Sequence, residues 1–178
     1  MRPEEWTDLR FVWLQRGIYE EKFEITDLEI RDARQISEDQ YEYYSDEYRP
    51  LKKDDMYFTP DGTAFIRGHV QIPAHMKGKN IYFTLHTAAE MIVKINGKYV
   101  GGVDPNRERI LLNPYIDSDN LTIEIEAYNR SKPDDERNPA SLAHRGCRQI
   151  FEGAYLSTIR DNVQSLVYDY ILFMDIAH

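Results

Sequence analysis

Cysteine is nearly absent from this chain: Cys147 is the single one among 178 residues. One thiol cannot form an internal disulfide, which fits a reducing compartment, and we expect a cytoplasmic protein. The same scarcity excludes zinc-finger and iron–sulfur sites, because these need several thiolates. At this length no cross-link is required, since a folded chain of this size buries roughly 70% of its unfolded surface.

Positive charge and long apolar runs are also scarce. Lys and Arg number 22 against 31 Asp and Glu, which gives a net charge of −9. Such a chain repels phosphate polyanions. No apolar run approaches the roughly 20 residues needed to cross a bilayer, and the acidic N-terminus lacks the apolar stretch of a secretory signal. Neither nucleic acid nor a membrane is therefore an expected partner.

The first 55 residues combine a short helical pattern with an acidic stretch. Trp6, Leu9 and Leu14 approximate a helical stripe, which Gly17 is placed to end. Residues 20–55 carry 13 acidic and 6 basic side chains and show little periodicity. We expect an irregular segment laid over the outside of the fold. Tyrosines are expected to pin it to the edge of the core: Tyr41, Tyr43, Tyr44 and Tyr48.

The middle of the chain alternates apolar and polar residues, which is typical of half-buried strands. The pattern covers residues 66–72, 81–86, 91–95 and 121–127. Asn96-Gly97 follows one of these runs, and this pair is a strong hairpin signal because a type I′ turn needs two positive φ angles. Strands with turns between them and no intervening helical pattern predict a mainly β fold, an antiparallel β-sandwich or jelly roll.

The C-terminal region is expected to contain one more strand, over residues 153–159, and then a helix. Asp161 and Gln164 stand at capping-box spacing. Apolar residues follow at helical spacing: Val163, Leu166, Val167, Tyr170, Ile171 and Met174. So wide an apolar stripe needs a partner surface, either on the sandwich or in a further domain.

These patterns divide the chain into three parts. Residues 1–55 form a short N-terminal helix and the acidic wrapping segment, and residues 56–160 form the β-sandwich domain. Residues 161–178 form a C-terminal linker helix, and the family resemblance given below implies that it leads toward a missing catalytic domain.

No group of residues gives a strong catalytic signal. Glu124 and Glu126 share one face of a strand about 6.6–7 Å apart, which overlaps the carboxylate separations of glycosidases. Alternate residues of an antiparallel strand are more often solvated surface, and we expect that here. The five histidines show no metal-ligand spacing. Ser141 and His144 lack the G-x-S-x-G elbow of a serine hydrolase. We therefore expect no catalytic residue and no metal ligand in this chain.

Five short motifs stand in an order that resembles the galactose-binding-like jelly roll of many glycoside hydrolases. They are Phe65-Ile66-Arg67, Pro73, the Lys94–Lys98 hairpin, Gly101–Asp104 and Tyr128–Arg130. The chain more closely resembles the N-terminal, non-catalytic domain of cytosolic-type α-mannosidases of glycoside hydrolase family 38, over residues 1–178. In that family a helix and a charged segment precede the β-domain, and a helix then leads to the catalytic domain.

The resemblance implies an accessory domain that hydrolyses nothing by itself, within a parent enzyme that hydrolyses terminal α-mannosides. It implies no cofactor in this chain and zinc in the parent's catalytic domain. The family's His-x-Asp zinc signature is not present, because residues 175–178 read Asp-Ile-Ala-His. The implied roles are shaping the active-site mouth, contacting carbohydrate, or oligomerisation. The implied partners are the chain's own catalytic domain, a mannose-containing glycan and a second copy of the chain.

Four residues are candidates for carbohydrate or domain-interface contact: Asp104, Arg107, Tyr128 and Asn129. In an accessory domain, Asp104 reaches out of the sandwich to order the neighbouring domain or bind a sugar hydroxyl. The alternative is a loop residue that caps residues 106–109. In a free-standing carbohydrate-binding module, Asp104, Tyr128 and Asn129 line a rim site. A third possibility is a protein-interaction jelly roll that forms oligomers without any dependence on sugar.

Overall fold

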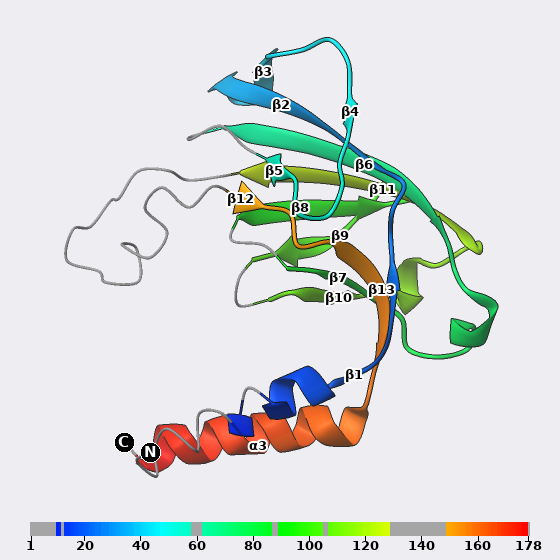
Figure 1. The fold of residues 1–178 in the computed structure, drawn as a ribbon, viewed down its shortest axis with the longest axis vertical. Helices are drawn as coiled ribbons and strands as arrows, with labels where there is room; N and C mark the ends of the chain where they lie inside the picture. The colour runs from blue at the N-terminus through cyan, green and yellow to red at the C-terminus, as the bar shows by residue number, and fades with distance from the viewer. Residues whose placement is uncertain are drawn as a thin grey trace.

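The computed structural model describes residues 10–11, 13–57, 62–86, 89–104, 107–128 and 149–177, and the structural statements below refer to these residues. Figure 1 shows layered β-sheets with a long helix beneath them. Every strand pairing among these residues is antiparallel. The fold is thus the mainly β, antiparallel sandwich that the alternating pattern predicts.

The larger sheet has seven strands. In spatial order it runs through β3 (Gln40–Tyr43), β2 (Leu28–Ser37), β6 (Thr63–Gln71), β11 (Asn120–Tyr128), β8 (Glu90–Ile95) and β9 (Lys98–Val103), and β4 (Arg49–Pro50) also pairs with β2.

The smaller sheet has four strands. Its spatial order is β1 (Tyr19–Glu24), β13 (Ala154–Ile159), β7 (Tyr82–Leu85) and β10 (Arg109–Leu111). The remaining elements are the pair β5 (Met56–Tyr57) and β12 (Gln149–Ile150), the 3-10 turns η1 (Ala74–Met76) and η2 (Asn113–Tyr115), and the helix α3 (Asp161–Ala177).

The two sheets enclose one hydrophobic core. Ile66, Ile123 and Val93 fill it from the larger sheet, and Phe83 and Leu156 fill it from the smaller one. All five side chains are buried, while their neighbours along the larger sheet face outward. The alternation seen in the sequence thus becomes a dry inner face and a wet outer face.

The Asn96-Gly97 hairpin joins β8 to β9, as predicted. Asn96 has φ 51° and Gly97 has φ 74°, the left-handed values that a type I′ turn requires. The Asn96 amide also braces β11, because its Oδ1 accepts a hydrogen bond from the Thr122 backbone N–H at 2.9 Å. Its Nδ2 donates to Asp117 at 2.8 Å. The turn is therefore fixed to two neighbouring segments.

The expectation that residues 20–55 are irregular was wrong. This stretch supplies β1 to the smaller sheet, and β2, β3 and β4 to the larger one. Leu28 and Ile30 are buried on the inner face of β2, and Glu29 lies between them opposite Arg67 of β6. Residues on neighbouring strands compensate the acidic charge of this stretch. The many charged residues therefore led to the prediction of an irregular segment where a half-buried strand forms. The domain boundaries at residues 55 and 160 stay predictions.

The C-terminal helix is present, but its start differs from the prediction. Asp161 is the first helical residue, and the Gln164 N–H donates to the Arg160 carbonyl oxygen at 3.0 Å. Arg160 therefore precedes the helix, and the Gln164 side chain donates to the Tyr168 hydroxyl at 3.1 Å. The expected capping box does not form. No helix among the described residues is long and apolar enough to span a bilayer.

Candidate functional site

Asp104 and Arg107, two of the predicted contact residues, close the loop that follows β9. Their backbones exchange hydrogen bonds of 3.1 and 3.0 Å. The Arg107 N–H also donates to Asp104 Oδ1 at 3.0 Å, and Arg107 Nε lies 3.4 Å from Asp104 Oδ2. The alternative interpretation, in which Asp104 caps this loop, is thus confirmed. Its contact with a sugar or a neighbouring domain stays a prediction.

Tyr128 ends β11, where it pairs with Thr63 of β6 and Glu90 of β8. Its side chain is exposed on the outer face of the larger sheet. Met91 pairs with Val103 on the far side of β8. Asp104 and Tyr128 therefore lie at the same end of the sheet, on opposite sides of β8. The fourth predicted contact residue, Asn129, lies outside the described residues, as do Ser141, His144 and Cys147.

Glu124 and Glu126 lie on the wet face of β11, as expected. Glu126 accepts a hydrogen bond from the Tyr41 hydroxyl, which raises the pKa of Tyr41 to about 12. The Tyr41 ring meets Phe65 edge to face, with 4.9 Å between ring centroids. Tyr43 also packs on Phe65, at 5.6 Å. The predicted role of these tyrosines in pinning their segment is confirmed for Tyr41 and Tyr43.

A cavity of about 910 Å³ lies between α3 and the edge of the smaller sheet. We call it the junction cavity. Tyr82, His86 and Arg109 line it from the sheet side, and Val167 and Ile171 line it from the helix. It is formed where segments far apart in the sequence meet, so no local motif marks it.

Three side chains along the wall of the junction cavity contact one another in a row: Lys22, His86 and Glu108. Lys22 Nζ lies 3.2 Å from His86 Nε2, and His86 Nδ1 lies 3.1 Å from Glu108 Oε2. His86 thus contacts Lys22 and Glu108 through its two ring nitrogens. The hydrogen bond to His86 holds the pKa of Glu108 below its ordinary value. Burial lowers the pKa of Lys22.

Basic side chains outnumber acidic ones along this wall, although the protein as a whole is acidic. Lys22 Nζ lies 3.8 Å from the centroid of the Tyr19 ring, and the Arg109 guanidinium lies 5.4 Å from the same ring. Arg16 and Arg107 also line the cavity. The wall can therefore donate hydrogen bonds to carboxylates or backbone carbonyls of a group that enters it.

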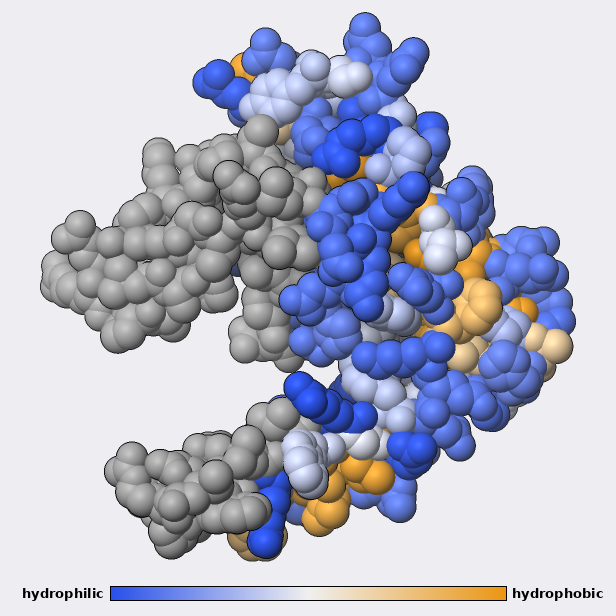
Figure 2. Space-filling view, viewed as in Figure 1, coloured by the Kyte–Doolittle hydropathy of each residue, from blue (hydrophilic) through white to orange (hydrophobic). Residues whose placement is uncertain are grey.

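The helix α3 packs against the N-terminal helical residues. Val163 and Val167 contact a small cluster that includes Phe11, Leu14 and Ile18. The Phe11 and Tyr170 rings stack with centroids 4.9 Å apart. The rest of the helix presents large hydrophobic side chains to solvent: Leu166, Tyr168, Ile171, Leu172 and Phe173. Figure 2 shows hydrophobic residues gathered along the helix at the bottom of the molecule.

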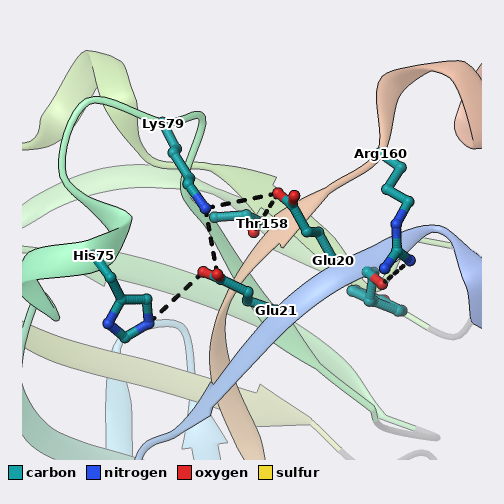
Figure 3. A network of polar contacts seen from close by, with 7 residues as sticks. Glu20, Glu21, His75, Lys79, Thr158 and Arg160 are labelled. Carbon is teal, nitrogen blue, oxygen red and sulfur yellow. Dashed lines mark hydrogen bonds and ion pairs between the residues drawn. The ribbon is translucent and has the colours of Figure 1, made fainter.

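A second polar network joins β1 to the loop after η1 (Figure 3). Lys79 Nζ lies 3.3 Å from Glu21 and 3.8 Å from Glu20. His75 Nε2 approaches Glu21 at 3.7 Å, and the Thr158 hydroxyl donates to Glu20 at 3.4 Å. These contacts hold the edge strand β1 in place. Among the described residues, no group of three or more His, Cys, Asp or Glu could hold a metal ion.

Comparison with known proteins finds no matching family model and no matching curated protein. Among solved structures, a calcium-binding mutant of Bacteroides uniformis β-glucuronidase 2 is 17% identical, with a TM-score of 0.47 over 77% of this chain and 18% of that chain. The β-D-glucuronidase of Dictyoglomus thermophilum is 15% identical, with a TM-score of 0.44 over 79% of this chain and 29% of that chain. The chain thus spans less than a third of either protein, and neither likeness assigns it a substrate or a site residue.

Proposed function

We propose that this chain is the accessory N-terminal domain of a cytoplasmic α-mannosidase. By itself it hydrolyses nothing. It packs against its own catalytic domain through α3 and the mouth of the junction cavity, and so shapes the entrance to an active site that lies elsewhere.

The observation that carries this proposal is the position of α3. One side of the helix packs against the N-terminal residues and the smaller sheet, in a cluster that includes Tyr82 of β7 and Ile159 of β13. Its other side exposes Leu172 and Phe173, which are 58% and 68% exposed. Contiguous exposed apolar surface on a folded protein marks an interaction site. A second domain seated there removes this surface from water.

The basic wall of the junction cavity supports the same proposal. Arg107 is the predicted contact residue that lines the cavity, and its guanidinium is largely exposed. Arg109 and Lys22 lie on the same wall. An interface between domains needs a polar rim around its apolar centre. The cavity wall beside α3 supplies such a rim on this side.

The sequence motifs that resemble the mannosidase domain also fall close together. Among the described residues, Phe65–Arg67 lie on β6, Lys94–Lys98 on the β8–β9 hairpin and Tyr128 on β11, and these strands are neighbours in the larger sheet. The ordered set therefore describes one structural unit rather than scattered matches. This placement supports the resemblance from which the α-mannosidase assignment comes.

The proposal is tested by assaying the purified chain on 4-nitrophenyl α-mannoside, with and without added zinc. We expect no turnover above a protein-free blank in either condition. Turnover that disappears in Glu124→Gln or Glu126→Gln would overturn the proposal, because it would place a catalytic carboxylate on β11. Glu29→Gln is the matched control, since Glu29 also lies on the outer face but on β2.

A further inference from the structure

A row of side chains crosses the outer face of the larger sheet. Glu29 of β2 pairs with Arg67 of β6, and Arg67 pairs with Glu124 of β11. Glu124 pairs in turn with Lys94 of β8, and Lys94 pairs with Tyr99 of β9. Facing residues on neighbouring strands lie about 4.5–5.5 Å apart at Cβ. The row therefore alternates in charge over four strands and ends on an aromatic ring.

The two cations of this row are engaged away from Glu124. Arg67 donates from Nε and Nη2 to Glu29 Oε2 at 2.9 and 2.8 Å, and its guanidinium lies 3.9 Å from the centroid of the Tyr48 ring. Lys94 Nζ lies 4.5 Å from the centroid of the Tyr99 ring. Within the described part of the chain, no ion pair or side-chain hydrogen bond involves the Glu124 carboxylate. Glu124 thus lies between two cations and pairs with neither.

The face around Glu124 is hollowed. A cavity of about 320 Å³ lies over these strands, and we call it the outer hollow. Its charged, titratable and aromatic lining residues are Tyr48, Phe65, Arg67, His69, Lys94, Tyr99, Glu124 and Glu126. Ile92 and Thr122 also line it. Its volume is at the small end of the range of about 300–1,000 Å³ that small-molecule sites occupy.

Two basic and two acidic side chains line the outer hollow, beside His69. Arg67 and Lys94 face Glu124 and Glu126. An ion of either sign that entered the hollow would therefore be repelled by the two side chains that carry its own sign. A hydroxyl group can both donate to a carboxylate and accept from an ammonium or guanidinium. The flat C–H face of a sugar can pack on a tyrosine ring, and Tyr99 is 68% exposed. Sugars combine these two properties in one small neutral molecule.

We propose that the outer hollow binds a neutral carbohydrate of one or two sugar units. Glu124 accepts hydrogen bonds from its hydroxyl groups, Lys94 and Arg67 donate to its oxygens, and Tyr99 packs against its apolar face. This site is distinct from the predicted rim site at Asp104, Tyr128 and Asn129. It does not depend on the chain belonging to an α-mannosidase, so the turnover assay and the binding assay can fail separately.

The test is calorimetric titration of the purified chain with α-1,2-mannobiose, cellobiose and lactose, with glucuronic acid and inorganic phosphate as charged probes. We expect at least one neutral disaccharide to bind more tightly than both charged probes. Tyr99→Ala and Glu124→Gln are each expected to weaken that binding roughly tenfold. Both positions are exposed, so unchanged thermal unfolding of the variants confirms that they fold.

Two further variants make the result decisive. Tyr44→Ala removes another exposed tyrosine that does not line the outer hollow, and it is expected to leave binding unchanged. Tyr128→Ala tests the rim site. The inference is overturned if no disaccharide binds, if the charged probes bind more tightly, or if Tyr128→Ala abolishes binding while Tyr99→Ala does not.

Discussion

The Arg160 guanidinium donates a hydrogen bond from Nη1 to the Tyr19 carbonyl oxygen at 2.7 Å, which ties the start of α3 to the start of β1. The same nitrogen donates to the Gly17 carbonyl oxygen at 2.9 Å. The Arg160 backbone N–H donates to the Ile18 carbonyl oxygen at 2.7 Å. Three carbonyls at the end of the N-terminal helical residues are therefore satisfied by one residue.

This contact predicts the effect of removing the guanidinium. Arg160→Ala keeps the backbone bond and loses the two side-chain bonds, so we expect it to lower the free energy of unfolding by about 1–2 kcal/mol. Chemical denaturation measures this loss, and hydrogen exchange should show faster exchange in α3. Arg34→Ala is the control, since Arg34 is exposed on β2. Equal effects of the two variants would contradict the anchoring role of Arg160.

Tyr41 and Glu126 predict a dependence on alkaline pH. The hydrogen bond to Glu126 raises the pKa of Tyr41 to about 12, above the ordinary value of about 10. The neutral phenol is therefore favoured in the fold, and its contribution to stability is full below pH ~10 and is lost as pH rises through about 12. Spectroscopic titration of phenolate absorbance should show a late-ionising tyrosine.

The matched variants identify that tyrosine. Tyr41→Phe should remove one late-ionising group, and Glu126→Gln should return the ionisation of Tyr41 toward the ordinary range. Glu124→Gln is the control, since Glu124 lies two residues away on the same face and makes no contact with Tyr41 among the described residues. Burial also raises the pKa of Tyr19 and Tyr82, so the test is the difference from the wild type. An alkaline titration that Tyr41→Phe leaves unchanged would contradict the assignment.

His86 and Glu108 predict a dependence on acidic pH. The hydrogen bond from His86 lowers the pKa of Glu108, so the folded state favours the ionised carboxylate. The resulting stability is present above the ordinary glutamate pKa of about 4.3 and is lost as pH falls through the lowered value. Glu108→Gln should therefore destabilise the protein at pH 7 and lose less stability than the wild type on acidification.

A second variant distinguishes the effect of the His86–Glu108 pair on stability from the effects of the other carboxylates. His86→Ala removes the donor, so Glu108→Gln made in that background should change the pH dependence little. Chemical denaturation of the four proteins at pH 7 and below pH 4 provides the comparison. If Glu108→Gln has the same effect with and without His86, the two side chains are not coupled.

The exposed side of α3 predicts binding of a hydrophobic dye. We expect the chain to enhance the fluorescence of anilinonaphthalene sulfonate, because α3 presents large apolar side chains to solvent. The double variant Leu172→Glu/Phe173→Glu should reduce this signal. Ile36→Glu is the control, since Ile36 is an exposed apolar residue of β2, away from the helix. Negligible dye binding by the wild type would contradict an uncovered apolar surface.

Much of the sandwich could be predicted because its signals are local. The alternation over β6 and β11 gives the buried face directly, and Asn96-Gly97 is one of few pairs that accept two positive φ angles. The strand β2 escaped prediction because Glu29, Arg31 and Asp32 suggest a solvated segment. Their charges are compensated by residues that come later in the sequence, such as Arg67.

The functional surfaces were harder to predict, because they join distant parts of the chain. The polar row in the junction cavity takes Lys22 from β1, His86 from just after β7 and Glu108 from just before β10. No spacing in the sequence links these three residues. The cross-strand row through Glu124 depends on the order of strands in the sheet, which alternation alone does not fix. By contrast, the loop-capping role of Asp104 could be predicted, since it depends on residues three positions apart.

The accessory-domain proposal is tested most directly on the native protein. An antibody raised against these residues captures that protein from its source, and intact mass, zinc content and turnover of 4-nitrophenyl α-mannoside are then measured on it. The account predicts a polypeptide heavier than 21.1 kDa that contains zinc and cleaves the substrate. A native polypeptide of 21.1 kDa, or a longer one without α-mannosidase turnover, would contradict it.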